Sequence, residues 1–204
     1  MDMTLTSPLA LERRDDAGLL TSVANGDSRA IVNLYHEHAR DLFRFIARRM
    51  DGPVEDVEEI LQDTMLAAVS AAGKFRGDCS VRTWLCGIAR NQIMQRRRTD
   101  LRKKRIPSSC TVSADENTID YLQQSSVDGY LLPMDLAESL AMKETVRQIM
   151  DQLEPDYREA LMLRYVDEFS IREIARICNK SERAVEGLLR RARLRAKEIG
   201  AQYL

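Results

Sequence analysis

Charged side chains near the end of the chain recur at a spacing that suits contact with the edges of DNA bases. The fork of an arginine matches two acceptors on guanine, and a glutamate can accept from the amino group of cytosine. A helix that opens at Ser181 would present Arg183 and Glu186 near its N-terminus, where a recognition helix meets base edges. The later arginines are expected to hold phosphates. The predicted contacts to duplex DNA are Ser181, Arg183, Glu186, Gly187, Arg190, Arg191 and Arg193.

Two helices and a tight turn must position these side chains. Ser170 and Glu173 have the spacing of a capping box, which opens a first helix. Asn179 can adopt the left-handed backbone of a turn, and Ser181 then caps the second helix. The order of cap, turn and cap favours a helix-turn-helix over about residues 155–197, against the alternative of a hairpin with a solvated basic face. Its expected buried positions are Ile171, Ile174, Ala175, Ile177, Val185, Leu189 and Ala192.

The helix predicted to begin at Pro155 leads into this motif, and Leu161, Met162 and Tyr165 are expected on its inner face. Far upstream, the helix predicted after Pro53 has one apolar and one polar face. Plain solvation is the default interpretation of such a polar stripe when it stands alone. The polar positions are Glu55, Asp56, Glu58, Glu59, Gln62 and Asp63. A loop over residues 73–79 follows, and Ser80 can cap a long basic helix.

Composition and charge point to a helical protein with anionic partners. The 204 residues are 44% hydrophobic but only 5% aromatic, which suits packed helices with an aliphatic core. The net charge is only −1, but the charges are unevenly distributed along the chain. Basic segments at residues 82–105 and 170–198 lie on either side of an acidic segment at 106–142. Four widely spaced cysteines without a CxxC pair suggest passive thiols in a cytoplasmic protein, with no cofactor or metal site. The longest apolar runs are too short to span a membrane.

Nearly every periodic segment is predicted to be helical, so the fold class is all-α. Residues 107–135 are acidic and lack periodicity, which predicts a flexible linker with regular helix resuming near Leu136. The expected organisation is a tail over 1–17, a helical domain over 18–106, the linker over 107–135, and a second helical domain over 136–204 that contains the helix-turn-helix.

Two sets of motifs resemble the extracytoplasmic-function (ECF) sigma factors of bacterial RNA polymerase. Residues 59–66, 75–78 and 83–91, which include the tryptophan helix Thr83-Trp-Leu-Cys-Gly-Ile-Ala-Arg-Asn91, resemble sigma region 2. Residues 153–165, 170–175 and 190–193 resemble sigma region 4. Both sets occur in the order and at the spacing of that family. The resemblance implies a non-catalytic transcription initiation factor, with region 2 in the first domain and region 4 in the second.

The resemblance also implies partners and contact residues. The polar stripe would dock on the β′ clamp helices of core polymerase through Glu55, Asp56, Glu59, Gln62 and Asp63. The melted −10 strand would be held by Phe75, Arg76, Asp78, Ser80, Asn91, Gln95, Arg96 and Arg97, and region 4 would read the −35 element. Other implied partners are the polymerase β flap and an anti-sigma factor, which could hold the protein at the membrane. Trp84 is expected to anchor the core and not to stack on DNA.

Some residues depart from the family pattern. Glu59 replaces an aspartate and Met65 an aromatic residue. In the recognition helix, Val185-Glu-Gly-Leu-Leu189 stands where the family often has V-K-S-R-L. Gly187 and Leu188 offer no polar group to a base, so base reading is expected from Arg183, Glu186 and Arg190, and the shape of the duplex is expected to supply further specificity.

The alternative function is a stand-alone helix-turn-helix regulator whose first domain senses a signal or dimerises. An enzyme acting on nucleic acid lacks support, because the sequence contains no Gly-rich phosphate loop and no Cys/His metal set.

Overall fold

The computed structural model describes residues 18–50, 52–104 and 133–203, and all regular structure among them is helical. This confirms the all-α prediction. The chain divides into two compact units, residues 1–123 and 124–204. Most of the predicted linker, the N-terminal tail and Cys110 lie outside the described residues.

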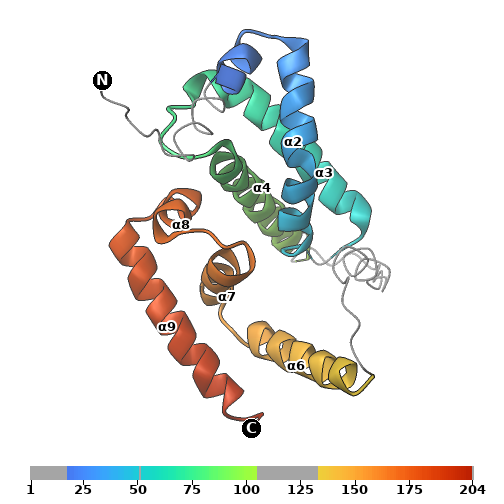
Figure 1. The fold of residues 1–204 in the computed structure, drawn as a ribbon, viewed down its shortest axis with the longest axis vertical. Coiled ribbons are helices and arrows are strands. Elements are labelled where there is room, and N and C mark those ends of the chain that lie inside the picture. Colours follow the sequence, from blue (N-terminus) through green and yellow to red (C-terminus); the bar gives the residue numbers. More distant parts are fainter. Residues whose placement is uncertain (1–17, 51, 105–132, 204) are drawn as a thin grey trace, which may run out of the picture. The chain divides into compact units, whose positions relative to one another are not determined.

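The first unit packs three long helices around an aliphatic core (Figure 1). A short helix at residues 18–24 ends at a turn in which Gly26 has a φ of +82°. Asp27 then caps the next helix by accepting from the Arg29 amide at 2.9 Å. The elements that follow are α2 (Ser28–Ala47), α3 (Val54–Ala71), the 3₁₀ turn η1 (Ala72–Lys74) and α4 (Val81–Lys104).

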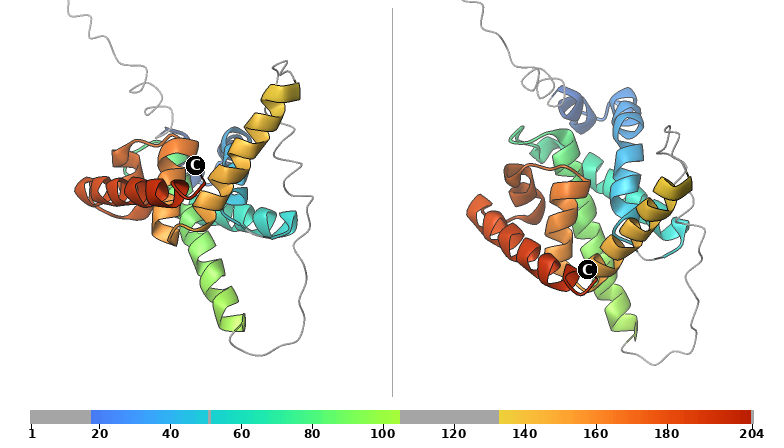
Figure 2. Two further views of the ribbon diagram at one scale, coloured as in Figure 1. Left: turned by 90° about the horizontal axis from the view of Figure 1, so that it is seen from below. Right: turned by 60° about the horizontal axis from the view of Figure 1, so that its bottom comes forward.

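Each of α2, α3 and α4 packs against the other two (Figure 2). The predicted apolar face of α3 is confirmed, because Val57, Ile60 and Leu61 are buried together with Met65 and Ala68. Arg49, just beyond α2, is also buried: its guanidinium lies over the ring of Phe45 at 3.7 Å and donates to the Phe45 carbonyl. Because the apolar side chains of α3 face the core, its polar residues lie on the opposite face.

The second unit is built around its last helix. Its elements are α6 (Pro133–Asp151), α7 (Pro155–Leu161), the π-helical turn η2 (Met162–Val166), α8 (Ile171–Cys178) and α9 (Glu182–Gly200). Helix α9 packs against α6, α7 and α8. Helix α6 begins at Pro133, three residues before the predicted start near Leu136, and proline suits the first turn of a helix because its missing N–H has no partner there.

The expected inner position of Tyr165 is wrong. The helix that begins at Pro155 changes to π geometry at Met162, whose carbonyl accepts from the Asp167 amide at 3.0 Å. A wider turn rotates later side chains away from the α-helical register. Tyr165 is consequently 58% exposed, and Leu163 and Phe169 fill the core in its place.

Candidate nucleic-acid and polymerase interfaces

The helix-turn-helix of the second unit has the local structure that its sequence predicts. Ser170 and Glu173 form both bonds of the capping box, with Ser170 N–H donating to Glu173 Oε2 at 2.9 Å. Asn179 adopts the left-handed conformation, with a φ of 51° and a ψ of 49°. Lys180 N–H donates to the Ala175 carbonyl at 2.8 Å, and Ser181 Oγ accepts from the Ala184 amide at 3.2 Å. These bonds fix where α9 starts and which face it presents.

Helix α9 has a buried apolar stripe and an outward face that is mostly charged. Val185, Leu189 and Ala192 are buried, as predicted, and Leu188 lies at the edge of that stripe. The other positions form a largely exposed face that is mostly charged but includes Leu194, which is 58% exposed. Within the described residues no hydrogen bond or ion pair engages its predicted DNA-facing side chains, namely Arg183, Glu186, Arg190, Arg191 and Arg193. Gly187 is half-buried, and a β-carbon there would approach Arg191 Nη1 to 3.5 Å.

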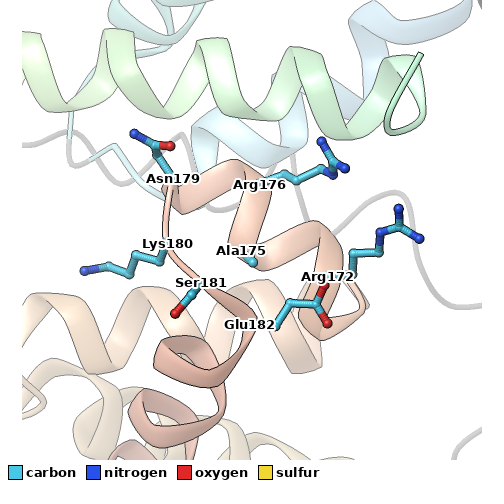
Figure 3. Close-up of a pocket in the computed structure, with 7 residues that line it drawn as sticks. All are labelled: Arg172, Ala175, Arg176, Asn179, Lys180, Ser181 and Glu182. Atoms are coloured by element: carbon cyan, nitrogen blue, oxygen red, sulfur yellow. The ribbon is translucent and has the colours of Figure 1, made fainter. Parts of the chain in front are cut away.

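A basic hollow beside the start of α9 was not predicted from the sequence. It has a volume of about 280 Å³ and is lined by residues of α8, the turn and the first residue of α9 (Figure 3). Three of its seven lining residues, Arg172, Arg176 and Lys180, are cationic and exposed. The signal was present in the sequence, because Arg172 and Arg176 are four residues apart and fall off the apolar stripe of α8.

The polar stripe of α3 is partly engaged within the first unit. Glu55, Gln62 and Asp63 are exposed, and no hydrogen bond or ion pair within the described residues engages their side chains. Asp56 is half-buried, and it and Glu59 both accept from Arg96 of α4. Leu66, one turn beyond, is 68% exposed although it is apolar. The sequence pattern alone does not distinguish Leu66 from the buried apolar residues of α3; its exposure in the structure does.

Arg96 joins the predicted polymerase surface to the predicted −10 surface. Its Nη1 lies 2.6 Å from Glu59 Oε2, its Nη2 lies 2.6 Å from Asp56 Oδ1, and its Nε lies 3.8 Å from Asp100 Oδ2. The hydrogen bond to Glu59 is the main cause that raises the pKa of the Arg96 guanidinium, with charge attraction from the three acids adding to it. Arg97 donates to the Arg49 carbonyl just past the end of α2. Helix C-termini favour such cations.

The loop before α4 is also internally bonded. The rings of Phe75 and Trp84 meet edge to face with their centroids 5.4 Å apart. Arg76 Nε lies 3.6 Å from Asp78 Oδ2 across Gly77, which has a φ of +71°. Ser80 Oγ accepts from the Thr83 amide at 3.2 Å and so caps α4, as predicted. By contrast, Asn91 and Gln95 lie exposed four residues apart, and within the described part of α4 no hydrogen bond engages their side chains.

Comparison with known proteins decides the family. Residues 34–103 match Sigma-70 region 2, and residues 143–195 match Sigma-70, region 4. The chain is 30% identical to the RNA polymerase sigma factor YlaC of Bacillus subtilis over 83% of its own length and 91% of that protein. It is 31% identical to the ECF RNA polymerase sigma factor SigM of Mycobacterium tuberculosis over 91% of its length and 85% of that protein. This chain is an ECF sigma factor.

Solved structures support the fold of this sigma factor. A structure of CnrH in complex with the cytosolic domain of CnrY matches 90% of the chain and 96% of CnrH, at a TM-score of 0.60 and 23% identity. The sigma factor RpoE of Bartonella quintana, solved with the anti-sigma factor NepR, matches 79% of the chain and 90% of RpoE, at a TM-score of 0.54 and 20% identity.

The comparisons make the chain a transcription initiation factor that directs RNA polymerase to promoters. Among the described residues of this ECF sigma factor, no helix is long and apolar enough to cross a membrane. The same residues contain no group of three or more His, Cys, Asp or Glu side chains placed to hold a metal ion. The thiol of Cys86 is buried, those of Cys79 and Cys178 are half-buried, and none of the three is part of a disulfide.

Proposed function

We propose that this sigma factor works without chemistry of its own, as a two-part promoter reader on core RNA polymerase. The first unit would bind the polymerase and the melted −10 strand, and the second would bind the −35 duplex. The observation that carries the proposal is the outward face of α9, where capping and turn geometry present a row of exposed charges that no group within the described residues engages.

For the −35 element, Arg183, Glu186 and Arg190 would face base edges, and Arg191 and Arg193 would contact phosphates. Arg172 and Lys180 join this proposal from the structure, because they are exposed at the basic hollow where α9 begins. Ser181 would contribute chiefly by capping the helix whose amide-rich end approaches the backbone of DNA.

For core polymerase, the stripe of Glu55, Asp56, Glu59, Gln62 and Asp63 would meet the basic β′ clamp helices. Such rim charges orient a partner more than they hold it. Leu66, exposed at the end of the same stripe, would add an apolar anchor. In the second unit, the exposed pair Met142 and Val146 lies four residues apart on α6 and is proposed to meet the β flap.

For the −10 strand, the proposed contact residues form two groups: side chains without an internal hydrogen bond within the described residues, and side chains that already have an internal bond or ring contact. Asn91 and Gln95 are available to hydrogen-bond the edges of unstacked bases. The engaged side chains would have to exchange an internal partner for DNA. They are Phe75, Arg76, Asp78, Ser80, Arg96 and Arg97.

We also propose control by an anti-sigma factor. The sigma factor RpoE of Bartonella quintana was solved with such a partner, and CnrH with the cytosolic domain of CnrY. An anti-sigma factor that covers the outward face of α9 would block −35 binding directly, because the proposed DNA-binding charges of α9 are exposed on that face.

The decisive experiment is co-purification of the full chain with core RNA polymerase, followed by promoter-dependent run-off transcription. Stable binding to core and specific transcripts are expected. Binding to duplex DNA without any affinity for core would favour the alternative of a stand-alone helix-turn-helix regulator. Selection of promoters from a random library, with Glu186→Lys alongside, then tests the assignment of α9 positions. A −35 preference unchanged by Glu186→Lys would remove Glu186 from the base-reading set.

A further inference from the structure

One arginine connects the two surfaces that the first unit is proposed to use. Arg96 lies on α4, and it donates from separate nitrogens to Asp56 and Glu59 on α3, each at 2.6 Å. These carboxylates are three residues apart, on one face of α3, so together they accept both terminal nitrogens of the guanidinium. We call Arg96 with Asp56 and Glu59 the Arg96 bridge.

The bridge is selective among neighbours of the same charge. Glu58 lies beside Glu59 on α3, and Arg98 lies two residues after Arg96 on α4. Both are exposed, and neither makes a hydrogen bond or ion pair within the described residues. Arg96 is only 27% exposed, whereas ordinary solvated arginines extend into water. The contact therefore depends on position and does not arise from the general attraction between an acidic and a basic helix.

We propose that the Arg96 bridge makes core binding and −10 strand binding depend on each other. In the free factor, Arg96 neutralises Asp56 and Glu59, the two carboxylates that are proposed to contact the basic polymerase helices. The same two carboxylates keep Arg96 away from its proposed contact with DNA. Polymerase cations that take over Asp56 and Glu59 release Arg96 toward the −10 strand. By thermodynamic reciprocity, DNA that takes Arg96 exposes the carboxylates to polymerase by the same factor. This inference rests on the proposed function of both surfaces.

The first test measures the affinity of the full-length chain for core RNA polymerase in the absence of DNA. Arg96→Ala frees both carboxylates, so we expect core binding to tighten roughly fivefold, at the lower end of usual coupling. The matched variant Arg98→Ala removes the same charge from the same helix without touching the bridge, and it should leave core affinity close to wild type. Core affinity of Arg96→Ala that is weaker than or equal to that of Arg98→Ala would overturn the bridge as a coupling device, since Arg96 would then only support the packing of α3 on α4.

The second test measures the other side of the reciprocity. The probe is a fluorescent single-stranded oligonucleotide that carries the −10 segment of a promoter transcribed by the holoenzyme, added to the free full-length chain. Glu59→Gln loosens the bridge and should tighten binding of the oligonucleotide more than Glu58→Gln, which makes the identical change one residue away. Equal gains from the two variants would reduce the effect to overall charge and would contradict the coupling.

The proposed function and the Arg96 coupling can be rejected separately. A wild-type chain that does not bind core polymerase would reject the proposed function, and the coupling with it. A wild-type chain that binds core, with Arg96→Ala and Arg98→Ala indistinguishable, would reject the coupling alone. Circular dichroism of each variant at the assay temperature checks that α3 and α4 remain folded, and Arg96→Lys, which keeps the charge but not the fork, should give an intermediate core affinity.

Discussion

The two units hold their proposed DNA-binding arginines in opposite states. On α9, Arg183, Glu186 and Arg190 are exposed and have no hydrogen-bonding partner within the described residues. In the first unit, Arg96 is bonded to two carboxylates of α3, and Arg97 is bonded to a carbonyl beyond α2. A surface of unpartnered charges can bind duplex DNA as it stands. A surface whose arginines are already bonded within the protein must exchange those bonds for contacts to DNA. Its affinity for DNA therefore depends on whether another partner, such as polymerase, occupies the internal bonding groups.

The largest expected effect is a loss of stability when a buried core residue of the second unit is truncated, because that core holds α9 in position for DNA. Ile174 is fully buried in α8, so Ile174→Ala should destabilise that unit by about 2–5 kcal/mol through lost burial and a cavity. Hydrogen exchange on the full chain should show lost protection in α7–α9 while α2–α4 keep theirs. Ile171→Ala, a half-buried neighbour on the same helix, should cost less. Equal loss of protection in α2–α4 would mean that the first unit depends on the second for its stability.

The next effect separates base reading from phosphate binding on α9. Arg190→Ala should weaken holoenzyme binding to its preferred −35 duplex by about 1–3 kcal/mol, with relaxed preference at one base pair. Arg195→Ala is the control, because that guanidinium pairs with Glu198 at 3.1 Å. Competition with mutated −35 duplexes provides the measurement. A uniform loss across all sequences would reassign Arg190 to a phosphate.

A smaller effect concerns backbone strain next to the helix-turn-helix. Glu168 has a φ of 61°, in the left-handed region that costs a residue with a β-carbon about 1–3 kcal/mol. Glycine removes that strain but loses more chain entropy on folding, so Glu168→Gly should stabilise the second unit by about 1 kcal/mol. Asn179→Gly should gain less, because asparagine tolerates the same conformation. Urea denaturation of the full chain measures both variants, and a loss of stability in Glu168→Gly would show that its side chain contributes more than the strain costs.

The smallest effect is a dependence of stability on acid pH in α6. Hydrogen bonds from Arg147 at 2.8 and 2.9 Å, then one from Gln148, lower the pKa of Glu144 from 4.5 to about 2. A carboxylate with a lowered pKa in the folded state stabilises the fold above pH 4.5, and that contribution is lost as the pH falls through about 2. The free energy of unfolding of Glu144→Gln should therefore vary less than that of wild type over this interval. Identical pH profiles would show that this exposed cluster is too well solvated to matter.

Local features of the sequence determined most of the second unit. The Ser170 and Ser181 caps, the left-handed Asn179 turn and the buried stripe of α9 were all predictable, because each depends on residues within one or two helical turns. The same holds for the Ser80 cap and the apolar face of α3. The position of Tyr165 was not predictable in this way, since a single π turn changes the register of every side chain after it.

What only the tertiary structure decided is which charges meet. Helical periodicity placed Asp56 and Glu59 on an outward face of α3 and Arg96 on α4, and the sequence therefore predicted two separate surfaces, one for polymerase and one for DNA. The packing of α3 against α4 brings these side chains, 37 and 40 residues apart in the chain, within 2.6 Å. No local pattern carries that information, because the distance between faces of two helices depends on how their cores interlock. On the outward face of α9, Arg183, Glu186 and Arg190 have no hydrogen-bonding partner among the residues that the structure describes, so the local sequence was sufficient to predict their exposure.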